Sequence, residues 1–122
     1  MKNLRILLAD DHSLMRRGLR SILEAQPGWQ VCAEAHTGTE AVEMAQKLQP
    51  NVAILDISMP EMTGYEFAQE IRRRPEWNDI CLVAVTGYGQ ESDKTLAKEA
   101  GFNSHVVKPI GKGDLKRLLM SL

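Results

Sequence analysis

The chain has 122 residues, of which 43% are hydrophobic and 25% are charged, and its formal net charge at pH 7 is −1. This length fits one domain, expected over residues 1–122, that can bury a core without disulfides or metal ions to stabilise it. The balanced charge gives no electrostatic sign of a surface for nucleic acid or membrane, so we expect direct contact with neither. Cys32 and Cys81 lie in apolar runs, which favours buried, reduced thiols, and a single disulfide between them stays an alternative.

The first part of the chain alternates apolar runs with amphipathic stretches. Residues 4–9 form an apolar run. One charged residue interrupts the run, and two acidic residues follow it. This is neither a signal peptide nor a membrane span, so we expect the first strand of a cytoplasmic protein. The stretch 12–26 predicts a helix, because it carries at helical spacing Leu14, Met15, Leu19, Ile22 and Leu23. Further strands are predicted over 29–35 and 51–55, with a helix over 38–49 between them that the following proline ends.

The second part of the chain continues this alternation. Its expected elements are a helix over 63–74, a strand over 80–85, a helix over 91–101, a strand over 104–107 and a helix over 113–122. The basic run from Arg72 to Arg74 is typical of a solvated helix end, and the segment from Pro75 to Ile80 of a short loop. Gly101 is typical of a residue that ends a helix.

The order of these elements predicts the fold class. Strict alternation of strands and helices through short connections indicates an α/β domain with a parallel sheet and helices on both faces. The runs at 51–55 and 80–85 are almost continuously apolar, as is typical of strands covered on both faces. We therefore expect a flavodoxin-like, doubly wound domain of five parallel strands in the order 2-1-3-4-5, flanked by five helices.

Polar residues follow four of the five expected strands. Asp10 and Asp11 come after the first strand and Asp56 after the third, while Thr86 and Lys108 follow the fourth and the fifth. Each is weak alone, because an acid after a strand is often a helix cap or a turn residue. In a doubly wound sheet, however, ligands bind at the rim formed by the carboxyl ends of the strands. We expect the five side chains to converge there.

The predicted cluster has the composition of a phosphoryl-transfer site. Three crowded carboxylates repel one another unless a cation lies among them, and Mg²⁺ suits a shallow site with oxygen ligands. A carboxylate beside Mg²⁺, a hydroxyl and an ammonium group can attack a phosphoryl group and carry it as an acyl phosphate. The two cations would neutralise charge on the transferred oxygens.

Four segments carry a recognisable pattern: "LLADDHSLMRRGLRSIL", "VAILDISMPEMTGYE", "LVAVTGYGQ" and "AGFNSHVVKPI". In their order and spacing the chain resembles, over essentially its whole length, the response-regulator receiver domain of two-component signalling. The resemblance implies a phosphorylation-switched signalling module of a phosphorelay. Such a module accepts a phosphoryl group from a phosphohistidine and is not a classified enzyme.

The resemblance also implies roles for the residues around the acceptor. Asp56 is the implied phosphoacceptor. The implied ligands of Mg²⁺ are Asp10, Asp11, Asp56 and the backbone carbonyl of Ser58. His12, at the start of the first helix, is expected to be a surface residue and not a metal ligand, because imidazole suits zinc better than magnesium.

The resemblance further implies a switch. Thr86 would be the hydroxyl that moves toward the phosphoryl group, and Lys108 would pair with a phosphoryl oxygen. His105 takes the place of a ring that turns inward on activation, and a half-exposed surface histidine is the alternative. Gly64, in the loop after the acceptor strand, is expected to allow a backbone turn that other residues resist.

Partners follow from the same resemblance. Upstream we expect a sensor histidine kinase or a histidine phosphotransfer protein. Downstream we expect a protein partner or a tethered output domain, docked on the face formed by the helix over 91–101, the strand over 104–107 and the last helix. Phosphorylation-dependent homodimerisation stays open, as does whether the chain stands alone or belongs to a hybrid kinase or a longer regulator.

The sequence also bears on two other functions. A receiver-like interaction domain that is never phosphorylated is disfavoured by the full set of rim residues. A Mg²⁺-dependent aspartyl phosphohydrolase commonly has a second aspartate two residues after its nucleophile, where this chain has Ser58.

Overall fold

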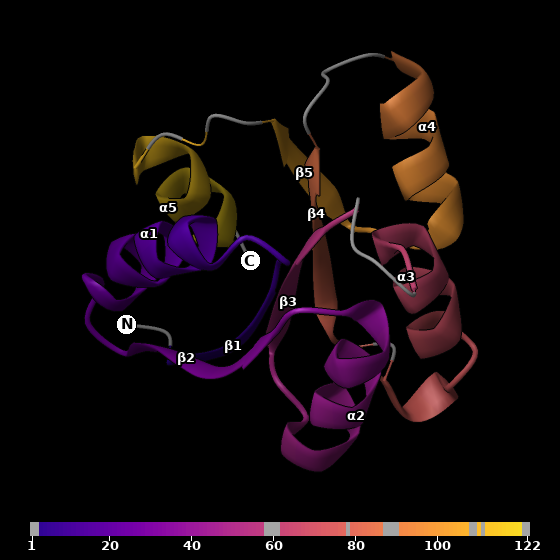
Figure 1. Ribbon diagram of the computed structural model, residues 1–122, viewed down its shortest axis with the longest axis horizontal. Coiled ribbons are helices and arrows are strands. Elements are labelled where there is room, and N and C mark those ends of the chain that lie inside the picture. Colours follow the sequence, from indigo (N-terminus) through magenta and orange to yellow (C-terminus); the bar gives the residue numbers. More distant parts are fainter. Residues whose placement is uncertain are drawn as a thin grey trace.

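The structure, a computed structural model, describes residues 3–57, 62–77, 79–86, 91–107, 110 and 112–120. Its centre is a parallel sheet with the strand order β2-β1-β3-β4-β5 (Figure 1). The strands are β1 (Leu4–Ala9), β2 (Trp29–Ala35), β3 (Val52–Asp56), β4 (Cys81–Thr86) and β5 (Ser104–Val107). The predicted fold class and strand order are confirmed. Strands β3 and β4 each begin and end one residue later than expected, so each includes the polar residue at its end.

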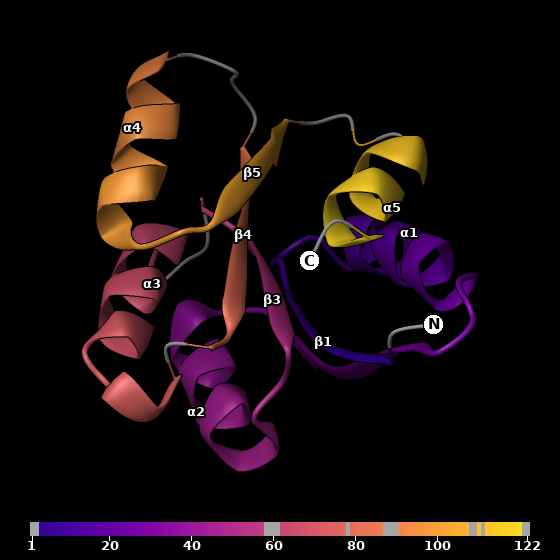
Figure 2. The ribbon, with the colours of Figure 1, turned by 180° about the vertical axis from the view of Figure 1, so that it is seen from behind.

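Helices cover both faces of the sheet. Figures 1 and 2 show α1 and α5 on one face and α2, α3 and α4 on the other. Their bounds are α1 (Ser13–Glu24), α2 (Gly38–Leu48), α3 (Gly64–Arg72), α4 (Glu91–Ala100) and α5 (Lys112–Met120). Gly101, with φ of 113°, follows α4 as the expected stop. Within the described residues, no helix has both the length and the apolar character that a membrane crossing requires.

An apolar core lies on each face of the sheet. On one face Phe67 and Ile71 of α3 pack with alanines of α2 and α4. On the other face Leu19 and Leu23 of α1 pack with Leu115 and Leu119 of α5. Strand β3 contributes to both cores, and all its residues are buried, which explains its continuous apolar sequence.

The apolar stripe of α1 is wider than the face that the helix buries. Leu19 and Leu23 are buried, and Met15 and Ile22 are partly buried. Leu14 is 81% exposed, so the expectation that it packs with the others is wrong. The stripe therefore leaves apolar side chains on the surface of the domain.

Strand β2 contains an irregularity at Cys32. The register between β1 and β2 shifts after Ile6, so that Cys32 is skipped in the pairing. Cys81 lies in β4, three strands away in the sheet, which is roughly 14 Å at the usual strand spacing. A disulfide requires Cα atoms within about 7 Å. The alternative of a disulfide is therefore wrong, and both cysteines are free thiols that are partly rather than fully buried.

The arginines at the end of α3 differ in their surroundings. Arg73 is 75% exposed, as expected. Arg72, in contrast, donates a hydrogen bond of 2.7 Å to the side chain of Asn103, and partial burial lowers its pKa from the ordinary value. Arg74 lies over the tryptophan ring of a short 3₁₀ turn, η1 (Pro75–Trp77), where a loop was expected. The prediction of a solvated helix end is thus wrong for Arg72.

Candidate functional site

Asp10 and Asp56 are brought together by the register of two neighbouring strands. Ala9 of β1 lies opposite Leu55 of β3, and an aspartate follows each of them. Adjacent strands are about 4.8 Å apart, so the two carboxylates meet at the carboxyl end of the sheet, as the sequence predicts. Both side chains are almost fully buried, with exposed fractions of 1% for Asp10 and 2% for Asp56.

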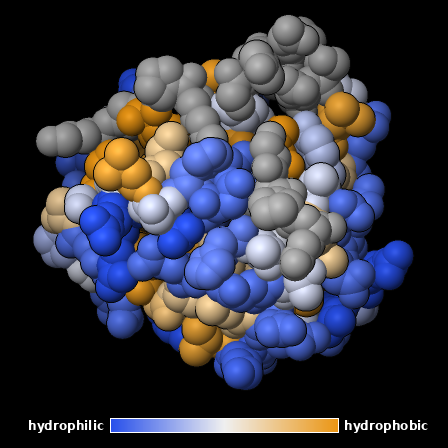
Figure 3. Space-filling model, in the orientation of Figure 1, coloured by the Kyte–Doolittle hydropathy of each residue, from blue (hydrophilic) through white to orange (hydrophobic). Residues whose placement is uncertain are grey.

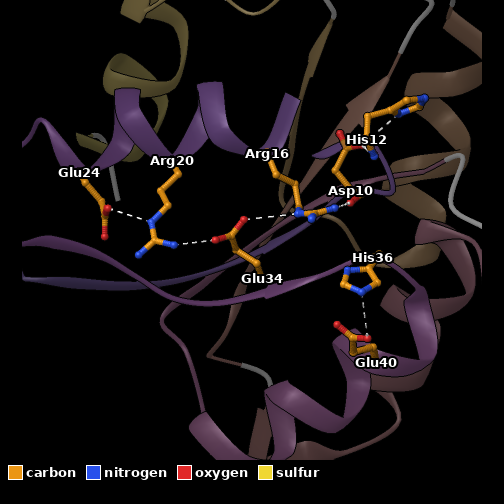
Figure 4. A network of polar contacts seen from close by, with 8 residues as sticks. All are labelled: Asp10, His12, Arg16, Arg20, Glu24, Glu34, His36 and Glu40. Carbon is orange, nitrogen blue, oxygen red and sulfur yellow. Dashed lines mark hydrogen bonds and ion pairs between the residues drawn. The ribbon is translucent and has the colours of Figure 1, made fainter. Parts of the chain in front are cut away.

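Asp11 and His12 complete a compact group around these two acids. Potential ligand atoms of Asp10, Asp11, His12 and Asp56 all lie within 4.8 Å of one another. The Nδ1 atom of His12 is 3.0 Å from Oδ1 of Asp11 and 3.2 Å from Oδ1 of Asp10. His12 is 67% exposed, in agreement with the prediction of a surface residue, yet its ring contacts Asp10 (Figure 4) and Asp11.

The buried carboxylate of Asp10 is only partly satisfied. Its Oδ1 atom accepts a hydrogen bond of 2.8 Å from the backbone N–H of His12. Its Oδ2 atom is buried and has no hydrogen-bond partner among the described residues. Such an oxygen destabilises a fold by about 1–3 kcal/mol, and a hard divalent cation would supply the missing partner. Asp10, Asp11 and Asp56 therefore fit Mg²⁺, while Ser58, the fourth predicted ligand, lies outside the described residues.

A series of charged side chains supports the end of β1 (Figure 4). Arg16 of α1 donates hydrogen bonds to the backbone carbonyl of Asp10, at 2.6 Å, and to Glu34 of β2, at 3.3 Å. Arg20, one turn further along α1, donates to the other oxygen of Glu34 and to Glu24. The bond from Arg20 lowers the pKa of Glu24. The series fixes the backbone from which the Asp10 carboxylate extends.

A glycine at the start of α3 lets this helix lie directly against the end of β3. A Cβ atom at Gly64 would be 2.8 Å from the Cα of Ile57 and 3.2 Å from the carbonyl oxygen of Asp56. Gly64 is an ordinary helical residue, so the expected reason for glycine, a special backbone turn, is wrong. Glycine is required there by the close approach of two backbones.

Thr86 and His105 lie on the same face of the sheet. Thr86 is 2% exposed and ends β4, the strand next to the one that carries Asp56. His105 of β5 pairs with Ala84 of β4, and paired residues of parallel strands point to the same face of the sheet. Thr86 is two residues after Ala84 in the same strand, so its side chain also points to that face. His105 is half-buried and borders a hollow of about 510 Å³ beside α4. Lys108, the remaining predicted residue, lies outside the described residues.

An apolar groove adjoins the acidic group. It has a volume of about 510 Å³ and is lined by His12, Leu14, Met15, Gly18, Leu19, Ile22 and Ile110. Figure 3 shows apolar surface gathered on the side of the molecule formed by α1 and α5. Because His12 belongs both to the groove and to the acidic group, the groove opens beside the carboxylates.

Sequence reasoning placed His12 on the surface without predicting its contacts with the acids, and it missed Gly38. His12 occupies the position before α1 but makes no capping hydrogen bond through its side chain. Serine or aspartate is usual at this position, so the histidine was a signal in the sequence that its ring has another role. Gly38 begins α2, and a Cβ atom there would be 2.6 Å from the Cβ of Met62. That contact between two distant segments left no local signal in the sequence.

The fold and the site together define a doubly wound α/β domain with an acidic cluster, able to hold a divalent cation, at the carboxyl end of its sheet. Residues 6–120 match the family model of the response regulator receiver domain. The chain belongs to this family, and it is a phosphorylation-switched signalling module of two-component systems.

The chain is similar to proteins that carry different names. It is 40% identical over 119 residues to protein-glutamate methylesterase/protein-glutamine glutaminase 2 of Carboxydothermus hydrogenoformans, covering 95% of this chain and 32% of that protein. It is 37% identical over 105 residues to the transcriptional regulatory protein LiaR of Bacillus subtilis, covering 86% and 49%. The chemotaxis response regulator CheY4 of Vibrio cholerae has a similar structure, with a TM-score of 0.88, 27% identity and 98% of each chain covered.

The chain spans only about a third to a half of these two curated relatives, at 32% and 49% of their lengths. Their activities therefore do not transfer directly to this receiver domain. One of these relatives is a transcriptional regulator. The expectation that the protein does not contact nucleic acid is therefore not supported for a longer protein that contains this domain.

Proposed function

We propose that Asp56 accepts the phosphoryl group in this receiver domain, with Mg²⁺ held by Asp10, Asp11 and Asp56. The observation that carries the proposal is the pair of buried carboxylates in adjacent register, one of which has a buried oxygen without a hydrogen-bond partner among the described residues. Strand β3 is buried along its length, so it holds the Asp56 carboxylate in a fixed direction. Bound Mg²⁺ supplies positive charge for the phosphoryl oxygens. The carbonyl of Ser58 is proposed as a further ligand.

The proposed reaction is a displacement at phosphorus. A carboxylate oxygen of Asp56 attacks the phosphorus of a phosphohistidine, and an O–P bond forms while the N–P bond breaks. The donor imidazole leaves with the bonding electron pair, and Asp56 becomes an acyl phosphate. Lys108 is proposed to pair with a phosphoryl oxygen at this stage.

Thr86 and His105 are proposed to transmit the new charge. The hydroxyl of Thr86 moves toward the phosphoryl group, and the His105 ring turns into the space on the same face of the sheet. The face formed by α4, β5 and α5 changes as a result, and Leu96 and Val107 already expose apolar surface there, at 49% and 37%. This face is proposed to bind a downstream protein, a tethered output domain or a second copy of the chain.

The apolar groove along α1 is proposed to receive the phosphodonor, a histidine kinase or a histidine phosphotransfer protein. A donor bound there through Leu14 lies beside His12 and hence beside the acceptor. We propose that the domain works in the cytoplasm, where ATP supplies such donors, and that it is a phosphoacceptor and not an enzyme in its own right. The methylesterase named above matches it over only 32% of its length.

The deciding experiment treats the protein with acetyl phosphate and Mg²⁺ and measures its intact mass. We expect a gain of one phosphoryl group that is lost in Asp56→Asn and retained in Asp114→Asn, which removes an exposed carboxylate of α5. An unchanged gain in Asp56→Asn would show the proposal to be wrong.

The donor groove is tested separately. Leu14→Asp should slow transfer from a phosphorylated histidine phosphotransfer protein but not phosphorylation by acetyl phosphate. Arg73→Asp, which places the same acid at an exposed position at the end of α3, away from the groove, is the control. Equal slowing in both variants would count against the groove.

A further inference from the structure

His12 occupies the N-cap position of α1, but its side chain does not cap the helix. It precedes α1 with extended backbone angles (φ −97°, ψ 106°), the position where a short polar side chain normally caps the helix. Its side chain makes no capping bond. Its Nδ1 atom lies instead at 3.0 Å from Asp11 and 3.2 Å from Asp10. The ring is thus directed at the acidic group and away from the helix.

The group that results has one nitrogen and three carboxylate donors. Its potential ligand atoms are all within 4.8 Å of one another. Four ligands placed tetrahedrally at zinc distances lie about 3.3 Å apart, close to the two separations found for Nδ1. The buried Oδ2 atom of Asp10, which has no hydrogen-bond partner among the described residues, is a second and independent sign of a missing ligand.

We propose that His12 makes this site a binding site for a borderline divalent cation such as Zn²⁺, which competes with Mg²⁺. Imidazole is a good ligand for zinc and a poor one for magnesium, which prefers oxygen donors and retains water. His12 should therefore raise the affinity for Zn²⁺ and contribute little to the affinity for Mg²⁺. The inference rests on the metal site of the proposed function and adds a residue and a second class of metal to it.

A different role for the ring predicts the opposite result. If His12 acted as an internal cation that neutralises Asp10 and Asp11, its removal would strengthen the binding of any divalent ion. If His12 is a ligand, its removal weakens the binding of Zn²⁺ alone. The two roles are therefore distinguished by comparing the metals in one variant.

The test measures the affinities of the whole chain for ZnCl₂, by competition with a chromophoric chelator, and for MgCl₂, by amide chemical shifts. In His12→Ala we expect Zn²⁺ binding to weaken on the order of tenfold or more, and Mg²⁺ binding to change by less than about twofold. His36→Ala is the matched control, because His36 is also exposed, at 62%, and also lies near an acid, Glu40. In the wild-type chain, Zn²⁺ should shift the ring nitrogen resonances of His12 and not those of His36.

The outcomes separate this inference from the proposed function. If His12→Ala binds Zn²⁺ as tightly as the wild-type chain while Mg²⁺ still binds, His12 is not a ligand and only this inference fails. Tighter binding of both ions in His12→Ala also overturns it. If neither ion binds the wild-type chain, or if Asp10→Asn binds both without loss, the metal site itself is wrong and the inference fails with it.

Discussion

Arg72 and Asn103 join two parts of the domain that are distant in the sequence. The guanidinium of Arg72 donates a hydrogen bond of 2.7 Å to the side-chain oxygen of Asn103, and the same oxygen accepts a bond of 2.8 Å from the backbone of Leu82. Arg72 also donates to the carbonyl of Gly101, at 3.0 Å. One side chain of α3 thereby secures the start of β4 and the turn between α4 and β5.

Removing this arginine should destabilise the domain. We expect Arg72→Met to lower the free energy of unfolding by about 2–3 kcal/mol, because the charged hydrogen bonds from its guanidinium to Gly101, Trp77 and Asn103 are lost. Arg73→Met is the control and should change it by less than about 0.5 kcal/mol, because Arg73 is exposed. Urea unfolding measures both, and equal effects would contradict the assignment.

Two glycines should respond in opposite directions to the same substitution. Gly64→Ala places a Cβ atom 2.8 Å from the backbone of Ile57, so we expect the free energy of unfolding to fall by about 1–3 kcal/mol. At Gly18 in α1 a Cβ atom would meet nothing within 4 Å, so Gly18→Ala should raise it by about 0.5–1 kcal/mol through helix propensity. Thermal unfolding of the two variants beside the wild-type chain is sufficient, and a loss of stability in Gly18→Ala would contradict this prediction.

The acidic group should reduce stability when no metal is bound. Asp10→Asn removes a buried charge with an unsatisfied oxygen, so the metal-free variant should gain about 1 kcal/mol in the free energy of unfolding. Mg²⁺ should then raise the unfolding temperature of the wild-type chain and have little effect on that of the variant. Calorimetry with Mg²⁺ and with a chelator checks both parts. A variant that is less stable without metal would mean that the Asp10 charge is already compensated.

The two cysteines should react slowly in the folded chain. Burial raises the pKa of Cys32 and of Cys81 above their usual value of 9.0, and the thiolate is the reactive form. Alkylation near neutral pH, followed by mass spectrometry, should therefore be slower than in urea. As pH rises above 9.0 the unfolded chain releases these protons first, so the free energy of unfolding should fall. Cys32→Ala should reduce that fall, and equal alkylation rates with and without urea would contradict the prediction.

Much of the fold could be predicted because its signals are local. Apolar runs and helical spacing are properties of neighbouring residues, and they located every strand to within one residue. The meeting of Asp10 and Asp56 was also predictable, since parallel strands bring their carboxyl ends to one edge of the sheet. These inferences needed only the order of the elements.

The remaining features depend on contacts that no local pattern encodes. The apolar stripe of α1 did not reveal that Leu14 is exposed to solvent. The arginine run at the end of α3 did not reveal that Asn103 comes within reach of Arg72. Likewise, the sequence showed His12 next to two acids but not which way its ring points.

Strand β2 is irregular at Cys32, and this irregularity affects how the protein aggregates in a crowded solution. This strand is one of the two outer strands of the sheet, where unpaired backbone groups can recruit a strand of another molecule. The skipped residue breaks the regular spacing that an incoming strand needs, and Glu34, bound by Arg16 and Arg20, keeps charges along the same strand. This edge of the sheet is thereby a poor template for strand addition by another copy, even where copies gather at high local concentration around a shared partner.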